Sequence, residues 1–330
     1  MSGSSVSERT GVLDPTIQRF VDELTAAKAP PVYKLTPEKA RDALLGLQSR
    51  RVERPDAQIK DWTVDTTVGP VHLRTIRPVS TGEATPAILY FHGGGWVMGD
   101  ATTHDRLVRE LALGTEATVI FVDYGRAPEH QYPVAIEQGY AAIRYVSEHA
   151  PEFGVDPTKL AVAGDSAGGN MATVVAHLVM QRSGPRISCQ VMFYPVTSAD
   201  LDTASYTQFA DGPWLTRPAM QWFWDQYLPD QSKRKESSAA PFLASSEELS
   251  GLPAALVITA ENDVLRDEGE AYGRKLMQAG VDTIVTRYNG AIHDFVMLNS
   301  IANSPAVRAA VAEAVEFLKH TFARPDVPGV

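Results

Sequence analysis

The chain has 330 residues, and its 30 Lys and Arg against 40 Asp and Glu give a formal net charge of −10. An acidic chain without a long basic run is a poor candidate for a nucleic-acid surface. Hydrophobic residues make up 44% of the sequence and charged residues 21%, which argues against global disorder and indicates a globular protein with a large core. The length gives an expectation of about two domains.

Cysteine usage and hydropathy exclude further classes of protein. A single cysteine, Cys189, excludes an intramolecular disulfide framework and a zinc site built from several cysteines. No apolar stretch approaches the roughly 18 residues of a membrane span. The start of the chain, MSGSSVSERTG, has no basic segment followed by an apolar run. We therefore expect no signal peptide, no membrane span and a cytoplasmic location.

The first fifty residues carry two helix patterns. Asp14 before Pro15 offers an N-cap residue followed by proline at the first helical position. Apolar residues at positions 17, 20, 21 and 24 then recur at helical spacing. Thr36 repeats the start signal, and apolar residues at 40, 43, 44 and 47 repeat the spacing. The sequence therefore predicts two amphipathic helices in this region.

From about residue 62 the pattern becomes that of strands. Residues 62–68 and 71–76 predict a β-hairpin with its turn at Gly69-Pro70. Beyond it, short apolar runs alternate with segments of helical spacing such as 171–178 and 307–318. The runs occupy residues 87–91, 117–122, 160–163, 189–194, 255–259 and 284–288. Short continuous apolar runs suit strands buried on both faces, so this alternation predicts an α/β fold with a mostly parallel sheet flanked by helices.

Residues 200–247 interrupt this alternation. Aromatic residues crowd into the first part of the segment, and a polar stretch follows them. We interpret the segment as a helical insertion between two strands.

A serine lies where one apolar run gives way to a helix. Residues 164–168 read G-D-S-A-G, between the run at 160–163 and the helical pattern at 171–178. Strand, tight turn and helix form the setting of a nucleophile elbow, in which a serine hydroxyl is exposed at the carboxyl end of the sheet. The alternative is a tight turn with an incidental serine. We favour Ser166 as the nucleophile.

A glycine run follows the strand predicted at 87–91. Residues 92–95 read H-G-G-G, the loop that supplies an oxyanion hole in lipases and esterases. We expect the N–H groups of Gly93 and Gly94, together with that of Ala167, to bind the oxyanion. A phosphate-binding loop is excluded because no Lys-Ser or Lys-Thr pair follows the glycines.

A serine nucleophile needs a base, and the base needs an orienting group. Of the eight histidines, His293 follows the last predicted strand and is the candidate base. Glu261 and Asp263 both follow the run at 255–259, and we favour Asp263 because it lies farther into the loop. Glu261 remains the alternative. The chain order Ser166, Asp263, His293 is that of α/β-hydrolases.

Together these motifs resemble the bacterial hormone-sensitive-lipase family of carboxylesterases over roughly residues 85–320. The resemblance rests on HGGGW at 92–96, on VDY and APEH within 122–130, on GDSAGGN at 164–170 and on DVLRDEG at 263–269. It implies an α/β-hydrolase fold and a serine carboxylesterase without cofactor or metal, acting on short- to medium-chain esters. It also supports Asp263 over Glu261.

The resemblance also implies a helical cap over the catalytic core. We expect residues 1–52 to form an N-terminal cap segment and 200–247 to form a cap insertion. The core would then consist of residues 53–199 and 248–330. A homodimer is compatible with this resemblance, since helices and edge strands of the fold often pair subunits.

Apolar side chains near these motifs are candidates for a substrate pocket. We consider Trp96, Met98, Phe209 and Trp214, although aromatic residues of this kind can instead form the core of the cap. The sequence departs from the family after His293, where glycine is usual and Asp294 stands. A carboxylate next to the base is expected to affect its electrostatics.

Other activities remain open on the sequence. An acyltransferase would use the same three residues, with an alcohol or amine replacing water as the acceptor. A lactone or amide hydrolase is a further alternative. The gibberellin receptors, which bind a ligand without catalysis, resemble this family but lack the catalytic histidine. The presence of His293 together with Ser166 and Asp263 favours an enzyme.

Overall fold

The structure is a computed structural model that describes residues 11–79, 82 and 84–324. Residues 1–10 of the expected cap segment, on which the signal-peptide prediction rests, lie outside the described residues. None of the described helices combines the length and the apolar character needed to cross a membrane.

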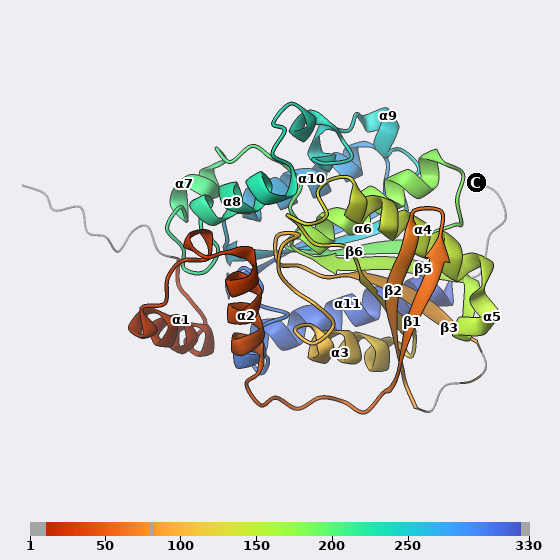
Figure 1. The fold of residues 1–330 in the computed structure, drawn as a ribbon, viewed down its shortest axis with the longest axis horizontal. Helices are drawn as coiled ribbons and strands as arrows, with labels where there is room; N and C mark the ends of the chain where they lie inside the picture. Colours follow the sequence, from red (N-terminus) through yellow and green to blue (C-terminus); the bar gives the residue numbers. More distant parts are fainter. Residues whose placement is uncertain (1–10, 80–81, 83, 325–330) are drawn as a thin grey trace, which may run out of the picture.

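An eight-stranded sheet forms the centre of the fold, in the order β1-β2-β4-β3-β5-β6-β7-β8 (Figure 1). Strands β1, β2 and β4 pair antiparallel, and every pairing from β4 through β3 to β8 is parallel. This confirms the predicted mostly parallel sheet. The strands are β1 (Gln58–Thr66), β2 (Gly69–Arg77), β3 (Thr85–Phe91), β4 (Thr118–Asp123), β5 (Val155–Asp165), β6 (Cys189–Phe193), β7 (Ala254–Asn262) and β8 (Thr283–Ile292).

Helices cover both faces of the sheet (Figure 1). Side chains along β3 alternate between two buried clusters, with Leu89 and Phe91 in one and Ile88 and Tyr90 in the other. This alternation is what a pleated strand buried on both faces produces. The first cluster contains residues of α4 (Val134–Glu148), α6 (Ala167–Gln181) and α10 (Arg266–Gln278), and the second contains residues of α3 (Asp105–Thr115) and α11 (Pro305–Ala323). A short helix, α5 (Ala150–Phe153), leads into β5.

The two predicted N-terminal helices are confirmed as α1 (Pro15–Ala27) and α2 (Pro37–Gln48). The Asp14 side chain accepts a hydrogen bond of 2.8 Å from the N–H of Thr16, and Thr36 caps α2 through the N–H of Lys39. Both caps satisfy backbone donors that have no partner inside the helix. A single 3₁₀ turn, η2 (Val32–Lys34), connects the two helices.

The hairpin of β1 and β2 turns two residues earlier than predicted. Thr66 pairs with Gly69, so the turn lies at residues 67–68 and Gly69-Pro70 belongs to β2. The Thr66 hydroxyl donates to the Gly69 carbonyl at 2.6 Å and closes the turn. Pro70 is tolerated there because the pairing of β2 with β4 begins only at residue 72, so no bond of that ladder needs its N–H.

The predicted helical insertion between β6 and β7 is confirmed. Figure 1 shows α7 and α8 close to the N-terminal helices at one end of the molecule, and α8 contacts η2. The insertion contains α7 (Ala204–Gln208), α8 (Arg217–Tyr227), η3 (Lys233–Lys235), η4 (Pro241–Leu243) and α9 (Ser246–Leu249).

Candidate active site

Ser166 lies in the tight turn between β5 and α6, as the motif predicts. Its backbone has φ 54° and ψ −117°, an unusual conformation for a residue other than glycine. A Cβ atom at Gly164 would overlap the carbonyl of Gly168, and one at Gly168 would overlap that of Phe91. The two glycines therefore allow the close packing of backbone that this turn needs.

The structure brings Ser166, His293 and Asp263 into one hydrogen-bonded row. The Nε2 atom of His293 lies 2.9 Å from the Ser166 hydroxyl oxygen, and its Nδ1 atom lies 2.7 Å from an Asp263 carboxylate oxygen. All three side chains are buried. Glu261, the alternative acid, instead accepts a hydrogen bond from the N–H of Gly290 at 2.7 Å. The arrangement allows His293 to take a proton from Ser166 while Asp263 orients the ring.

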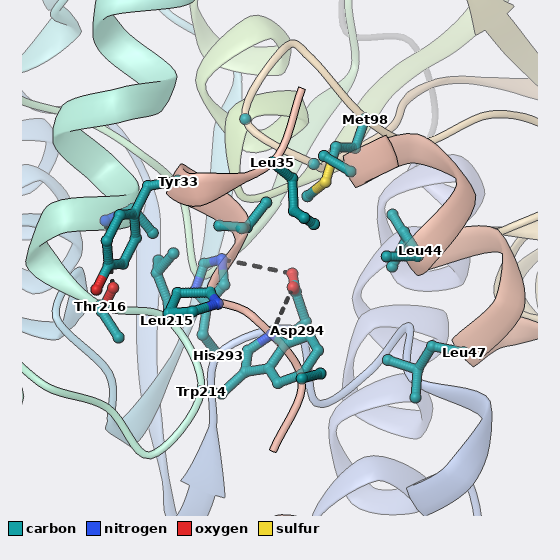
Figure 2. Close-up of a pocket in the computed structure, with 18 of the residues that line it drawn as sticks. Tyr33, Leu35, Leu44, Leu47, Met98, Trp214, Leu215, Thr216, His293 and Asp294 are labelled. Carbon is teal, nitrogen blue, oxygen red and sulfur yellow. Dashed lines mark hydrogen bonds and ion pairs between the residues drawn. The ribbon is translucent and has the colours of Figure 1, made fainter. Parts of the chain in front are cut away.

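Of the charged groups around His293, two neighbouring carboxylates have the largest influence on its charge. Burial alone would lower the pKa of His293, but the negative charges of Asp263 and Asp294 outweigh it and raise this pKa to about 9. Asp294 is 3.4 Å from Nε2, the nitrogen that faces Ser166. Its other oxygen accepts a hydrogen bond of 2.9 Å from the indole N–H of Trp214, as Figure 2 shows. The sequence departure at Asp294 thus places a second carboxylate beside the ring.

One of the three predicted oxyanion donors, the N–H of Gly93, is wrong. The N–H of Gly93 donates to the carboxylate of Asp165 at 3.0 Å, so it is not free to bind an oxyanion. Gly94 and Gly95 line the cavity above Ser166, and among the described residues their N–H groups have no hydrogen-bond acceptor. Ala167 is the first residue of α6, where a backbone N–H has no partner within the helix. The available donors are therefore those of Gly94, Gly95 and Ala167.

His92 precedes these glycines and packs beneath the loop. Its ring stacks on Tyr124 with centroids 4.1 Å apart, and the Tyr124 hydroxyl donates to the His92 carbonyl at 2.7 Å. Burial and the neighbouring His104 lower the pKa of His92 to about 3, so its ring is neutral.

Within the described residues, no group of three or more His, Cys, Asp or Glu side chains is arranged to hold a metal ion.

A largely apolar cavity of about 420 Å³ opens over Ser166 and His293. Met98 and Trp214 line it, as predicted (Figure 2). The prediction is wrong for Trp96 and Phe209. Trp96 is buried against Tyr227, with parallel rings 4.2 Å apart, and Phe209 lies under the Arg266 guanidinium. Both side chains stabilise the packing of the insertion instead of facing the cavity.

Other walls of the cavity come from the two segments expected to form the cap, through residues that the sequence analysis did not single out. Leu44 and Leu47 of α2 project into it from one side, and Leu215 approaches from the insertion (Figure 2). Only the amphipathic spacing of α2 marked these leucines, and that spacing does not distinguish a core face from a cavity wall.

Comparison with known proteins agrees with this geometry. A family model described as the alpha/beta hydrolase fold matches residues 88–297. Carboxylesterase NlhH of Mycobacterium tuberculosis is 36% identical over 314 residues, which cover 94% of this chain and 96% of that protein. Ethyl acetate hydrolase of Pseudomonas putida is 36% identical over 286 residues, which cover 84% of this chain and 88% of that protein.

Solved structures agree as well. The crystal structure of a thermostable esterase from Pseudomonas putida ECU1011 matches with a TM-score of 0.94 and 46% identity, covering 98% of this chain and 100% of that chain. The predicted resemblance to carboxylesterases of the hormone-sensitive-lipase type is therefore confirmed, and the chain belongs to the alpha/beta hydrolase fold family.

Proposed function

We propose that this protein is a serine carboxylesterase that hydrolyses carboxylic esters through an acyl-enzyme intermediate. The observation that carries the proposal is His293, which bridges Ser166 at 2.9 Å and Asp263 at 2.7 Å on the floor of an apolar cavity. The names of the similar proteins, carboxylesterase NlhH and ethyl acetate hydrolase, support ester hydrolysis.

The mechanism follows from this geometry. The Ser166 hydroxyl oxygen attacks the ester carbonyl while His293 Nε2 accepts its proton. Asp263 holds the ring in the required tautomer and stabilises the imidazolium. The negative charge on the carbonyl oxygen is stabilised by the N–H groups of Gly94, Gly95 and Ala167. His293 then protonates the leaving alcohol and activates the water that releases the acid.

The reaction is tested by product analysis with a nitrophenyl butyrate ester. We expect one butyrate released for each nitrophenol, because water is the acyl acceptor. Repeating the assay with an added alcohol distinguishes an acyltransferase, in which the butyryl ester of that alcohol would be the main product. An absence of nitrophenol release would contradict the proposal.

We propose short- to medium-chain esters as the substrates, and the apolar cavity of about 420 Å³ over Ser166 offers a place for their acyl or alcohol chains. A Trp in place of Leu44 would fill part of the cavity that lies opposite His293 in Figure 2. We expect Leu44→Trp to lower kcat/KM for octanoyl or octyl esters roughly tenfold or more, with a smaller effect on acetyl and methyl esters. Esters varied on both the acyl and the alcohol side provide the measurement. Leu45 is exposed and does not line the cavity, so Leu45→Trp is the matched control. Equal losses across both series, or a preference for long-chain triglycerides, would contradict this view.

We further propose that residues 1–52 and 200–247 act as a cap, with 53–199 and 248–330 as the core. Arg41 of α2 supports this, because its guanidinium donates to the carbonyls of Val97 and Ala127 at 2.8 and 2.9 Å. It also forms a two-pronged ion pair with Glu129. These contacts anchor α2 beside the glycine loop.

Removing this anchor is expected to loosen the cavity wall. Arg41→Ala should raise KM severalfold and lower the free energy of unfolding by about 2 kcal/mol, because two carbonyls lose a charged donor. Steady-state kinetics and urea denaturation measure the two effects. Arg50→Ala is the matched control, since within the described part of the chain Arg50 makes only an exposed ion pair, with Glu23. An unchanged KM in Arg41→Ala would contradict the anchoring role.

The raised pKa of His293 predicts the pH dependence of activity. His293 accepts a proton only when neutral, and its pKa lies at about 9, so kcat/KM should rise with pH until about that value. Asp294→Asn keeps the shape of the side chain but removes one of the charges that raise this pKa. We expect the acidic limb of the kcat/KM profile to move to lower pH in this variant. A limb that stays in place would show that Asp294 does not act on His293.

A further inference from the structure

A buried polar network lies directly behind Ser166 and has no part in the mechanism above. Its centre is Asp165, the residue before the nucleophile, whose side chain is fully buried. One carboxylate oxygen accepts hydrogen bonds from the Tyr90 hydroxyl at 2.7 Å and from the N–H of Gly93 at 3.0 Å. The other oxygen lies 3.3 Å from Nε2 of His104.

The contact of His104 with Asp165 favours the charged form of its ring. The Thr103 hydroxyl oxygen lies 2.9 Å from the Asp100 carbonyl oxygen and also 2.9 Å from Nδ1 of His104. Nε2 is the ring nitrogen that donates to Asp165, because a carboxylate can only accept. Burial alone would lower the pKa of His104, but the charge of Asp165 outweighs it and the pKa is raised. Burial alone would raise the pKa of Asp165, but His104 in turn lowers this pKa and so stabilises the ionised form of this buried carboxylate.

The Asp165 carboxylate connects the nucleophile to the glycine loop, the two parts of the site that act on the reacting carbonyl group. Asp165 is adjacent to Ser166 in the chain, and Gly93 is adjacent to Gly94 in the glycine loop. A Cβ atom at Gly93 would overlap the Asp165 carboxylate, so the loop rests against that group. One side chain therefore fixes the distance between the nucleophile and the N–H groups of Gly94 and Gly95.

We propose that Asp165 is a positioning residue that holds the glycine loop so that the N–H groups of Gly94 and Gly95 point at the oxyanion formed on Ser166. This rests on the proposed esterase function. A carboxylate suits the task because hydrogen bonds to an ionised acceptor are about twice as strong as neutral ones. His104 and Tyr90 supply the partners without which a buried charge would be costly.

Three variants and one control test this role. Asp165→Ala removes the acceptor for Gly93, whereas Asp165→Asn keeps an oxygen in that position. Tyr90→Phe removes one of the two donors that hold the same oxygen. Tyr272→Phe is the control, because the Tyr272 hydroxyl makes a buried hydrogen bond of 2.7 Å with Thr173, which is not a partner of Asp165 or Gly93 in the contacts above.

The expected result is a loss in kcat with little change in KM. Because misplaced oxyanion donors cost on the order of 10² in rate, Asp165→Ala should lose about that factor, and Asp165→Asn should recover at least about a tenth of the wild-type rate. Tyr90→Phe should lose on the order of tenfold, the effect of one hydrogen bond to a charged acceptor. Rates are compared on the plateau above pH 9, because the charge of Asp165 also contributes to the raised pKa of His293.

A trifluoromethyl ketone inhibitor separates positioning from general stability. Such a ketone adds the Ser166 oxygen to its carbonyl and leaves a negative oxygen in the place of the oxyanion. Its inhibition constant should rise by the same factor as kcat falls in each Asp165 variant and in Tyr90→Phe, and should not change in Tyr272→Phe. If Asp165→Ala does not fold, Asp165→Asn and Tyr90→Phe still decide the question.

Unchanged kcat in folded Asp165→Ala, or in Tyr90→Phe when the alanine variant does not fold, would overturn the positioning role. A fall in kcat without a matching rise in the inhibition constant would also overturn it. Wild-type protein without ester turnover would instead overturn the proposed function, so the two failures are distinguishable.

Discussion

Replacing Ser166 by alanine is expected to abolish ester hydrolysis and leave the fold intact. The rate should fall by a factor on the order of 10⁶, as expected when the nucleophile of a serine–histidine–aspartate triad is removed. Among the described residues, the Ser166 hydroxyl makes a side-chain hydrogen bond only with His293. Removing the hydroxyl therefore leaves no buried group other than His293 without that partner. Release of nitrophenol from a nitrophenyl ester measures the rate, and circular dichroism with thermal unfolding checks the fold. Hydrolysis at the wild-type rate by folded Ser166→Ala protein would refute the assignment of the nucleophile.

The second large effect is expected at Asp263. Asparagine there would offer a neutral amide to Nδ1 of His293, which favours the wrong tautomer of the ring and withdraws the charge that stabilises the imidazolium. We expect Asp263→Asn to lower kcat by about 10⁴ with a much smaller change in KM. Steady-state kinetics on the same ester provide the measurement.

Glu261→Gln is the matched control for that variant. Glu261 lies near the end of β7, two residues before Asp263, and was the alternative acid on sequence grounds, but its carboxylate accepts from the N–H of Gly290 instead of contacting His293. Glutamine can still accept that hydrogen bond, so kcat should stay within about threefold of wild type. A large loss in Glu261→Gln with an active Asp263→Asn would reverse the assignment of the two acids.

Much of the fold was predictable because its signals are local. Apolar runs such as 189–194 and caps such as Asp14 and Thr36 report on contacts within a few residues, and the structure has strands and helices there. The position of Ser166 was equally predictable, since the strand, the glycines and the helix around it are contiguous in sequence.

The details of the site depend on contacts between distant segments, which no local pattern reports. Gly93 was a reasonable oxyanion donor until the structure placed its N–H on a carboxylate 72 residues away. Trp96 and Phe209 have the apolar character of pocket residues, but they pack against Tyr227 and Arg266 and do not line the cavity. The hydrogen bond from Trp214 to Asp294 likewise joins residues 80 positions apart.

Covalent labelling with a fluorophosphonate tests the central claim most directly, because the reagent modifies a serine only where a base activates it and donors bind the developing charge. Mass spectrometry of the digested protein identifies the modified residue. We predict a single phosphonylated peptide carrying the label on Ser166, with labelling greatly slowed in Asp263→Asn and absent in Ser166→Ala. Ester hydrolysis by protein that remains unlabelled at Ser166, or a label on another residue that stops hydrolysis, would contradict it.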